Sequence, residues 1–332
     1  MLAVTGAAGF IGSNLLASME ASNQAPGSTD VVAFDVIDSD AKRANVGKRS
    51  GVTWVEPTDT LTYLRNHPDQ IEALIHLGAE TSTTATDRSA VFANNVDFSK
   101  TLWDWCATHS KPFIYASSAS VYGDGNLGFD DDLSQDALNR LKPLNIYGES
   151  KLAFDVYVSK ALAEGLPCPP QWAGLRFFNV YGPNEGHKGT QGSVISQMFP
   201  VVADGKPYPL FKSHRPGIAD GEQKRDFVFV DDCSDVIQWL LKSPDVSGLF
   251  NVGTGQARTF LDLARAVYAA ADQPFAIAWR DTPAHLQAHY QYFTEANLTR
   301  LRKAGYRDAF TSLEDGVTIT VRDHLSKSDP YR

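Results

Sequence analysis

Hydrophobic residues in the first half of the chain form short continuous runs, separated by longer segments with helical spacing. Runs in which successive residues are apolar, so that both faces of the strand are hydrophobic, are typical of parallel strands covered by helices on both faces. Intervening segments such as 91–109 and 146–164 are long enough for helical crossovers. The pattern therefore predicts an α/β fold with a Rossmann-like, doubly wound parallel sheet. Its strands are expected at Leu2–Thr5, Val31–Phe34, Val52–Val55, Ala73–Leu77, Phe113–Ala116 and Gly174–Phe178.

The pattern changes from Asn179 onward, where loops are rich in glycine, proline and charge, as in 213–221. Further on, Phe227–Val230 and Leu249–Val252 are predicted strands that return to the first domain. We therefore expect a dinucleotide-binding domain made of 1–178 plus 224–256. A smaller, discontinuous α/β substrate domain would consist mainly of 179–223 plus 257–332.

Composition narrows the classes of partner. The 332 residues carry a net charge of −9 without a basic cluster, which argues against nucleic acid. No apolar run reaches membrane-spanning length, so no membrane association is expected. Cys106, Cys168 and Cys233 are odd in number and lack metal-ligand spacing. With a strand at the very start and no signal peptide, the sequence predicts a cytoplasmic protein that binds no metal.

A glycine-rich turn follows the first predicted strand. Gly6, Gly9 and Gly12 have G-x-x-G-x-x-G spacing and precede a helical segment. Such glycines permit a tight turn, let backbone amides approach a pyrophosphate, and let the helix pack on the strand. Asp35 ends the second strand about 20 residues later, where a carboxylate can bind the adenosine ribose. The sequence therefore predicts a nicotinamide dinucleotide cofactor.

A second group of residues carries acid–base chemistry. Tyr147 and Lys151 are four residues apart, which places both side chains on one face of a helix. An ammonium beside a phenol favours the phenolate, which can exchange a proton with a substrate hydroxyl during hydride transfer. Ser118, at the end of the fifth strand, could share the same substrate oxygen. The alternatives are a surface i,i+4 pair for Tyr147 and Lys151 and a helix N-cap for Ser118.

These motifs, in this order, resemble those of the extended short-chain dehydrogenase/reductases, which include nucleotide-sugar epimerases and dehydratases. Within that superfamily, the stretch Phe178–Gly189 closely resembles the signature of the ADP-glyceromanno-heptose 6-epimerases. The segments 82–84, Lys224–Phe227 and Tyr290–Thr294 resemble the same family. It inverts carbon 6 of ADP-D-glycero-D-manno-heptose, and its product enters lipopolysaccharide biosynthesis.

The resemblance implies a mechanism with two proton-exchanging groups. Oxidation to a 6-ketone removes the stereocentre, and hydride return to the opposite face inverts it. Tyr147 serves one pose of the sugar, and in the family a lysine at the position of Lys188 serves the other. The alternatives for Lys188 are a solvated loop lysine or a phosphate contact. The family also implies a homo-oligomer, with a pentamer suggested.

The nicotinamide cofactor can be either NADP or NAD. Asp35 alone favours NAD, because a carboxylate repels a 2′-phosphate. Lys42 and Arg43 follow nearby and could neutralise that phosphate, or they could be solvated loop residues. A lysine at about this spacing accompanies NADP in the resembled family, so NADP is predicted.

The remaining expected site residues follow from the resemblance, position by position. Arg225 would bind the diphosphate of the ADP-heptose substrate as a bidentate donor, unless it pairs with Asp226, Asp231 or Asp232. Tyr290 would contact the sugar or the phosphates, unless it only packs in the core. The expected cofactor-binding residues are Gly6, Gly9, Phe10, Ile11, Gly12, Asp35, Lys42, Leu77, Gly78, Ala79, Thr81, Asn94, Tyr147, Lys151, Val180 and Lys188. The expected substrate-binding residues are Ser82, Asn179, Thr190, Gln197, Phe211, Lys212, Ser213, His214, Arg225 and Tyr290.

Two other functions remain open at this point. Another epimerase or dehydratase of the superfamily would share the scaffold, but the segment 120–123 lacks the acidic pair that dehydratases use. A non-catalytic sensor of the nicotinamide cofactor would typically lack the Tyr147 or Lys151 side chain, and this chain retains both. Ala7, Leu77, Thr190, Gln197 and the long segment 214–223 depart from the family pattern, which affects the expected substrate contacts.

Overall fold

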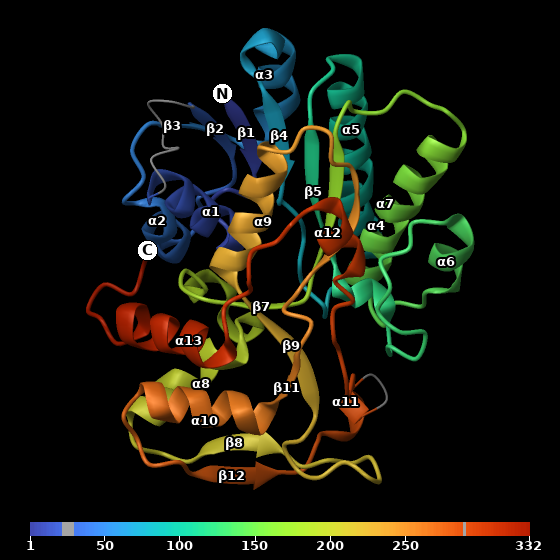
Figure 1. Ribbon diagram of the computed structural model, residues 1–332. Coiled ribbons are helices and arrows are strands. Elements are labelled where there is room, and N and C mark those ends of the chain that lie inside the picture. The colour runs from blue at the N-terminus through green and yellow to red at the C-terminus, as the bar shows by residue number, and fades with distance from the viewer. Residues whose placement is uncertain (22–29, 288–289) are drawn as a thin grey trace.

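The computed structural model describes residues 1–21, 30–287 and 290–332. A seven-stranded sheet lies at its centre, and every neighbouring pair of its strands is parallel. The strand order is β10-β6-β5-β4-β1-β2-β3 (Figure 1). This confirms the predicted doubly wound parallel sheet. Its strands are β1 (Leu2–Thr5), β2 (Val31–Phe34), β3 (Val52–Val55), β4 (Ala73–His76), β5 (Phe113–Ser118), β6 (Trp172–Phe177) and β10 (Gly248–Val252).

Helices cover both faces of this sheet, as its all-apolar strands require. On one face α1 (Phe10–Ala21) and α9 (Val230–Leu241) contribute Leu15 and Ile237 to the core. On the other face α5 (Phe98–Thr108) and α7 (Ile146–Ala163) contribute Trp103 and Phe154. Shorter helices complete the crossovers: α2 (Asp40–Val46), α3 (Thr60–Asn66), α4 (Arg88–Phe92) and α6 (Gln135–Arg140).

The crossover expected over 91–109 is not one uniform helix. It consists of α4, a π-helical segment over Ala93–Asp97, and α5. Within the π-helical segment, Asn95 is buried and forms hydrogen bonds with the loop after β4 and with α7. π-helical turns are often found near functional sites.

The rest of the chain forms two smaller sheets (lower half of Figure 1). In the three-stranded sheet, β9 (Lys224–Phe229) pairs in parallel with β7 (Asn179–Tyr181) and antiparallel with β11 (Ala257–Thr259). In the other sheet, β8 (Tyr208–Phe211) pairs in parallel with β12 (Ile277–Arg280). The helices of this region are α8 (Val194–Ala203), α10 (Phe260–Ala270), α11 (Ala284–Gln287) and α13 (Leu313–Thr318). Helix α12 (Thr299–Ala304) packs instead beside β10 of the central sheet.

Of the two strands expected to return to the first domain, β10 joins the central sheet beside β6, and β9 pairs in the three-stranded sheet. The strand β7 begins one residue after β6 ends, and β9 pairs with it in the register Asn179 to Phe227. The second sheet is therefore built directly against the carboxyl end of the central sheet.

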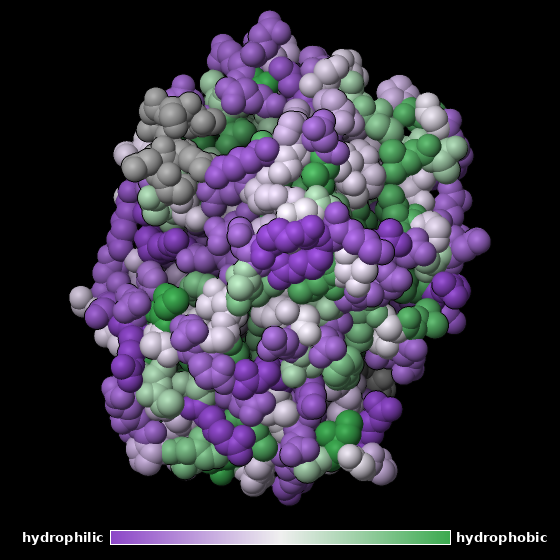
Figure 2. Space-filling view, in the orientation of Figure 1, coloured by the Kyte–Doolittle hydropathy of each residue, from purple (hydrophilic) through white to green (hydrophobic). Residues whose placement is uncertain are grey.

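The sheet order places the functional region. The strand order reverses between β1 and β4, and ligands of such sheets bind in the crevice beyond the carboxyl ends of the strands at this point. Figure 2 shows strongly hydrophilic residues near the middle of one face, where Figure 1 places α12, with apolar residues in small separate patches. Among the described residues, no helix combines the length and the apolar composition needed to cross a bilayer.

Candidate active site

The glycine turn after β1 has the close packing that its sequence predicted. Gly6 has φ +68°, and a Cβ there would lie 2.5 Å from the backbone nitrogen of Gly78. A Cβ on Gly12 would lie 2.2 Å from the carbonyl oxygen of Gly6. The turn therefore excludes larger residues, and it brings the N-terminus of α1, beginning at Phe10, to the carboxyl edge of the sheet. Unpaired amides at such a helix start fit a pyrophosphate.

Asp35 lies beside this turn at the end of β2. Its Oδ2 accepts a hydrogen bond from the backbone amide of Ala8 at 2.8 Å. Its Oδ1 accepts one from Lys42 Nζ at 3.1 Å, and that ammonium also donates to Val36 O. Arg43 is 67% exposed and lies near Asp40 instead. The residues present thus fit a dinucleotide, with an acidic and a basic side chain together where the adenosine ribose is expected.

Ser118, Tyr147 and Lys151 meet at the junction of β5 and α7. Helix α7 begins after Asn145, whose side chain accepts a hydrogen bond from the Gly148 amide. Lys151 Nζ donates to Ala116 O at 2.8 Å and lies 5.9 Å from the centroid of the Tyr147 ring. The structure therefore brings together three of the four residues predicted to be catalytic.

The surroundings alter the acidity of both groups on α7. Burial lowers the pKa of Lys151 to about 8, and the nearby Asp155 opposes this effect. Burial raises the pKa of Tyr147, and a hydrogen bond with Ser118 opposes it. The phenol in the ligand-free site is therefore less acidic than the spacing of Tyr147 and Lys151 predicted, because desolvation of the phenolate outweighs the hydrogen bond that favours it.

A buried ion pair lies behind this junction, and the sequence analysis did not identify it. Arg176 on β6 donates to Asp155 Oδ2 from Nε at 3.0 Å and from its terminal nitrogen at 2.9 Å, and both side chains are fully buried. Asp155 also accepts hydrogen bonds from Ser117 and Tyr115 on β5. Because Asp155 lies one helical turn after Lys151, α7 is attached to the end of β5 at two successive turns. The four-residue spacing from Lys151 was a sequence signal for Asp155, but no local pattern pointed to its partner Arg176 on another element.

His76, the last residue of β4, connects this strand to β1 and to α5 near the carboxyl edge of the sheet. Its Nδ1 lies 2.6 Å from Thr5 Oγ1, and its Nε2 lies 2.9 Å from Ser99 Oγ. Burial lowers the pKa of His76 to about 3, and Lys151 adds to this effect. The imidazole is therefore neutral and structural.

The expected cofactor residues Leu77, Gly78, Ala79 and Thr81 follow β4 at this edge. Their loop is fixed by Asn95, which accepts a hydrogen bond from the Glu80 amide and donates to the Glu80 carbonyl and to Ser150. Asn94 donates to Asn95, and the expected cofactor residue Val180 is a partly buried residue of β7. The loop after β4 is thus connected to the start of the glycine turn through Gly78 and Thr5, and to α7 through Asn95 and Ser150.

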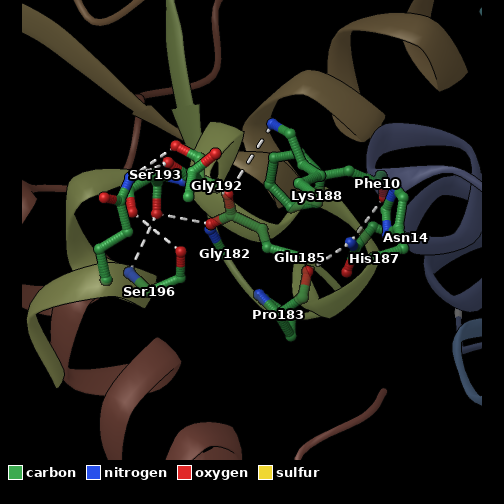
Figure 3. A network of polar contacts seen from close by, with 12 residues as sticks. Phe10, Asn14, Gly182, Pro183, Glu185, His187, Lys188, Gly192, Ser193 and Ser196 are labelled. Carbon is green, nitrogen blue, oxygen red and sulfur yellow. Dashed lines mark hydrogen bonds and ion pairs between the residues drawn. The ribbon is translucent and has the colours of Figure 1, made fainter. Parts of the chain in front are cut away.

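Lys188 lies on a different loop, which is attached to the start of α1 (Figure 3). Its Nζ is 4.9 Å from the centroid of the Phe10 ring and 3.8 Å from Glu185 Oε2. Asn14 donates to Pro183 O, and Asn184 donates to Ser13 Oγ. The fourth residue predicted to be catalytic is therefore held beside the glycine turn. A further bond, from Gln191 to the expected substrate residue Ser82, joins this loop to the one after β4.

Three expected substrate residues, His214, Arg225 and Tyr290, form a cluster. The guanidinium carbon of Arg225 is 5.7 Å from the Tyr290 ring centroid, and the His214 and Tyr290 rings are 5.8 Å apart. Tyr292, which sequence analysis did not single out, donates or accepts a hydrogen bond at His214 Nδ1 and packs edge-on against Tyr290. The neighbouring Gln291 donates to Gly123 O, which places the cluster close to the end of β5.

Arg225 is buried, and its hydrogen bonds go only to the backbone carbonyls of Lys224 and Gln291 in the part of the chain that the structure describes. The carboxylates considered as its alternative partners bind other groups: Asp226 binds Thr254, Gly255 and Ala296; Asp231 binds Arg332; and Asp232 binds Thr311. Burial lowers the pKa of Arg225 to about 10. A buried cation that lacks a carboxylate partner is suited to an anionic ligand.

Other expected substrate residues have local partners. Lys212 Nζ lies 3.1 Å from Asp281, and the Ser213 amide donates to Asp220. Gln197 donates to the carbonyls of Gly192 and of Thr190. Phe211 ends β8, and Asn179 accepts a hydrogen bond from Thr294. These residues lie around the segments that carry Lys188 and His214, and their role toward a ligand stays a prediction.

Comparison with known proteins identifies the family. The family model described as "NAD dependent epimerase/dehydratase family" matches residues 2–253. The chain belongs to this family. An ADP-L-glycero-D-manno-heptose-6-epimerase of Fusobacterium nucleatum is 40% identical, and one of Nitratidesulfovibrio vulgaris is 43% identical, each with full coverage of both chains.

Solved structures agree with the assignment to the NAD dependent epimerase/dehydratase family. The crystal structure of ADP-L-glycero-D-manno-heptose-6-epimerase from Helicobacter pylori has a TM-score of 0.78 at 26% identity, covering 97% of this chain and 95% of the other. UDP-glucose 4-epimerase from Thermus thermophilus in complex with NAD has a TM-score of 0.74 at 26% identity, covering 97% of both chains. The comparisons confirm the predicted superfamily and fold. They also support the predicted use of a nicotinamide cofactor and of a nucleotide-sugar substrate.

Proposed function

We propose that this epimerase inverts carbon 6 of ADP-D-glycero-D-manno-heptose to give ADP-L-glycero-D-manno-heptose. The full-length relatives at 40–43% identity bear the name of this activity. The observation that carries the proposal is the position of Lys188. It provides a second ionisable group at the glycine turn, in addition to the Tyr147–Lys151 pair at the end of β5.

The chemistry of the substrate requires two such groups. Carbon 6 bears a hydroxyl and a hydrogen but no acidic α-proton, so inversion proceeds by oxidation to the 6-ketone and reduction on the opposite face. A nicotinamide cofactor held by the glycine turn after β1 and by Asp35 would supply the hydride chemistry of both half-reactions. Tyr147 takes the hydroxyl proton in one pose of the sugar, and Lys188 gives a proton to the ketone oxygen in the other. Ser118 donates a hydrogen bond to the oxygen in the Tyr147 pose.

Arg225 would bind the diphosphate of the ADP moiety. The guanidinium can offer parallel N–H donors to phosphate oxygens, and an anion would compensate its burial. Tyr290, His214 and Tyr292 surround it with aromatic and polar surface. Holding the nucleotide here leaves the heptose free to take two poses at the nicotinamide.

We propose NADP as the cofactor, and Lys42 is the residue that supports this preference. Its ammonium lies against Asp35, at the expected ribose site, where it could offset repulsion between the carboxylate and a 2′-phosphate. The large exposure of Arg43 gives that residue a smaller part.

We also propose a cytoplasmic homo-oligomer, and a pentamer in particular, from the family resemblance. The three cysteines are free thiols, as expected in a reducing compartment. Native mass spectrometry of the purified protein would report the number of subunits and the mass of any bound dinucleotide in one measurement.

The function is tested by assaying inversion of ADP-D-glycero-D-manno-heptose with the parent enzyme, Tyr147→Phe and Lys188→Met. Each substitution removes one proton-exchanging group, so each is expected to lower turnover by roughly 10²–10⁴-fold while the cofactor stays bound. An analogue that is already an aldehyde at carbon 6 separates the two groups. Two analogue molecules and one water give one acid and one alcohol, and each half-reaction can use either pose.

In this dismutation each single variant is expected to retain measurable activity, and the double variant is expected to lose nearly all of it. Inversion of the natural heptose by Lys188→Met at the parent rate would show that Lys188 is a loop lysine. A parent enzyme that leaves carbon 6 unchanged but inverts another position of a nucleotide sugar would instead favour another epimerase of the superfamily.

A further inference from the structure

The loop that carries Lys188 contains a buried carboxylate to which the sequence motifs assigned no role. Glu185 is 5% exposed, and its side chain lies inside the turn formed by the loop (Figure 3). Its Oε2 is 3.8 Å from Lys188 Nζ, and the Lys188 amide donates to the Glu185 carbonyl at 2.9 Å. The two residues are therefore connected through both the backbone and the side chains.

The position of the carboxylate is fixed independently of Lys188. Ser193 donates to Glu185 Oε2 from its backbone amide at 2.6 Å and to Oε1 from its hydroxyl at 2.6 Å. The Gly182 amide donates to Oε1 at 3.4 Å. Charge-assisted hydrogen bonds of this kind are stronger than neutral ones, so the carboxylate is a rigid anchor at the start of α8.

The Lys188 side chain, in contrast, contacts two fixed neighbours and is otherwise accessible to a ligand. It is 26% exposed, with the Phe10 ring on one side and Glu185 on the other. A lysine side chain is long and flexible, and holding it in one direction costs side-chain entropy. Attraction to the fixed Glu185 carboxylate offsets this cost and determines where Lys188 Nζ is located. Because Phe10 begins α1 at the glycine turn, that location is at the cofactor side of the crevice.

We propose that Glu185 is a positioning residue that aims the Lys188 ammonium at the carbonyl oxygen of the substrate. This inference rests on the proposed function, because it assigns Lys188 the second proton transfer. Glu185 stays on the loop and exchanges no proton with the sugar. Its fixed carboxylate sets the direction in which the Lys188 ammonium points, toward the place where the 6-ketone would bind.

The experiment compares Glu185→Gln in two backgrounds with the aldehyde dismutation assay on the holoenzyme. In Tyr147→Phe only Lys188 can exchange the proton, and Glu185→Gln is expected to lower that activity by about tenfold or more, the usual effect of losing a charged contact. In Lys188→Met only Tyr147 can do so, and Glu185→Gln is expected to leave that activity within about twofold. A merely structural role would lower both activities equally.

Two controls keep the test decisive. Asp232→Asn changes another buried carboxylate, which accepts hydrogen bonds from Thr311 and none from the Lys188 loop among the described residues, and is expected to have the same small effect in both backgrounds. If Glu185→Gln does not fold, Ser193→Ala releases the anchor without changing charge and should give a smaller loss confined to the Tyr147→Phe background. Equal losses in the two backgrounds, or no loss in Tyr147→Phe, would overturn the role of Glu185. No residual dismutation by Tyr147→Phe would overturn this role and the two-group mechanism together.

Discussion

Arg225 faces Tyr290 with its guanidinium carbon 5.7 Å from the ring centroid, although 65 positions separate the two residues along the chain. The pair combines a buried cation with an aromatic face, and no carboxylate lies within ion-pair distance of the cation among residues 1–21, 30–287 and 290–332. A diphosphate would supply the missing negative charge.

Arg225→Met is therefore expected to raise the KM for the ADP-heptose by about 10–100-fold, because a charge-assisted contact contributes roughly 1.5–3 kcal/mol. The thermal midpoint of the ligand-free protein should stay constant or rise, since an uncompensated buried charge is removed. Arg258 lies opposite Arg225 in the β9–β11 pair but binds Glu314, so Arg258→Met is the matched control. An unchanged KM in Arg225→Met would contradict the diphosphate assignment.

The choice between NADP and NAD is expected to depend on Lys42. Lys42→Gln should weaken NADP binding by about tenfold or more and affect NAD much less, because only NADP carries the phosphate that the ammonium would meet. Arg43→Gln, a change at an exposed neighbour, is the control and should have a smaller effect. Calorimetric titration of both dinucleotides measures the two dissociation constants, and an equal loss for both cofactors would favour NAD as the natural one.

The pair formed by Asp155 and Arg176 is expected to make a large difference to stability when only one partner is changed. Asp155→Asn leaves a fully buried guanidinium without its counter-charge, which costs about 3–5 kcal/mol in the free energy of unfolding. The double change Asp155→Leu with Arg176→Met should recover much of that loss. Urea denaturation measures both, and a loss below about 1 kcal/mol for Asp155→Asn would show that the pair is solvated.

Acid should destabilise the protein through His76. Its pKa is about 3 in the folded chain and near 6.5 when unfolded, so between these values only the unfolded chain binds the proton. The contribution is fully present above pH 6.5 and is lost as the pH falls toward 3, at about 1.4 kcal/mol per pH unit.

His76→Gln should flatten the stability curve in this window. Asp131 and Asp232, whose pKa values burial raises to about 6, act in the opposite direction between about 3.8 and 6. Because they are present in both proteins, the difference between the two denaturation curves isolates His76. Parallel curves for parent and variant would contradict a neutral buried imidazole.

The local sequence was sufficient to predict the strands of the central sheet. Their apolar runs depend only on burial by helices on both faces, and β1, β2 and β3 have the predicted bounds. The sheet that β9 joins was not predictable in this way, because pairing depends on which strand lies beside it. A buried strand has the same composition in either sheet.

The same limit applied to the candidate site. Tyr147 and Lys151 lie one turn apart on a single helix, so their spacing alone predicts proximity. Arg176 and Asp155 are on different elements, and Glu185 meets Ser193 only because the loop folds back on itself. Such contacts are set by tertiary structure, and no periodicity in the sequence reveals them.

The connection between β6 and β7 has a consequence for motion. Only Phe178 separates the two strands, and it is buried in the core. The chain crosses again between β9 and α9 without an intervening residue, and between β10 and β11 through four residues. Hinge closure needs connecting residues that can absorb large backbone rotations, and these crossings offer few. We therefore expect side chains and surface loops to adapt when the heptose changes between its two poses. The central sheet and the three-stranded sheet are expected to keep their relative position.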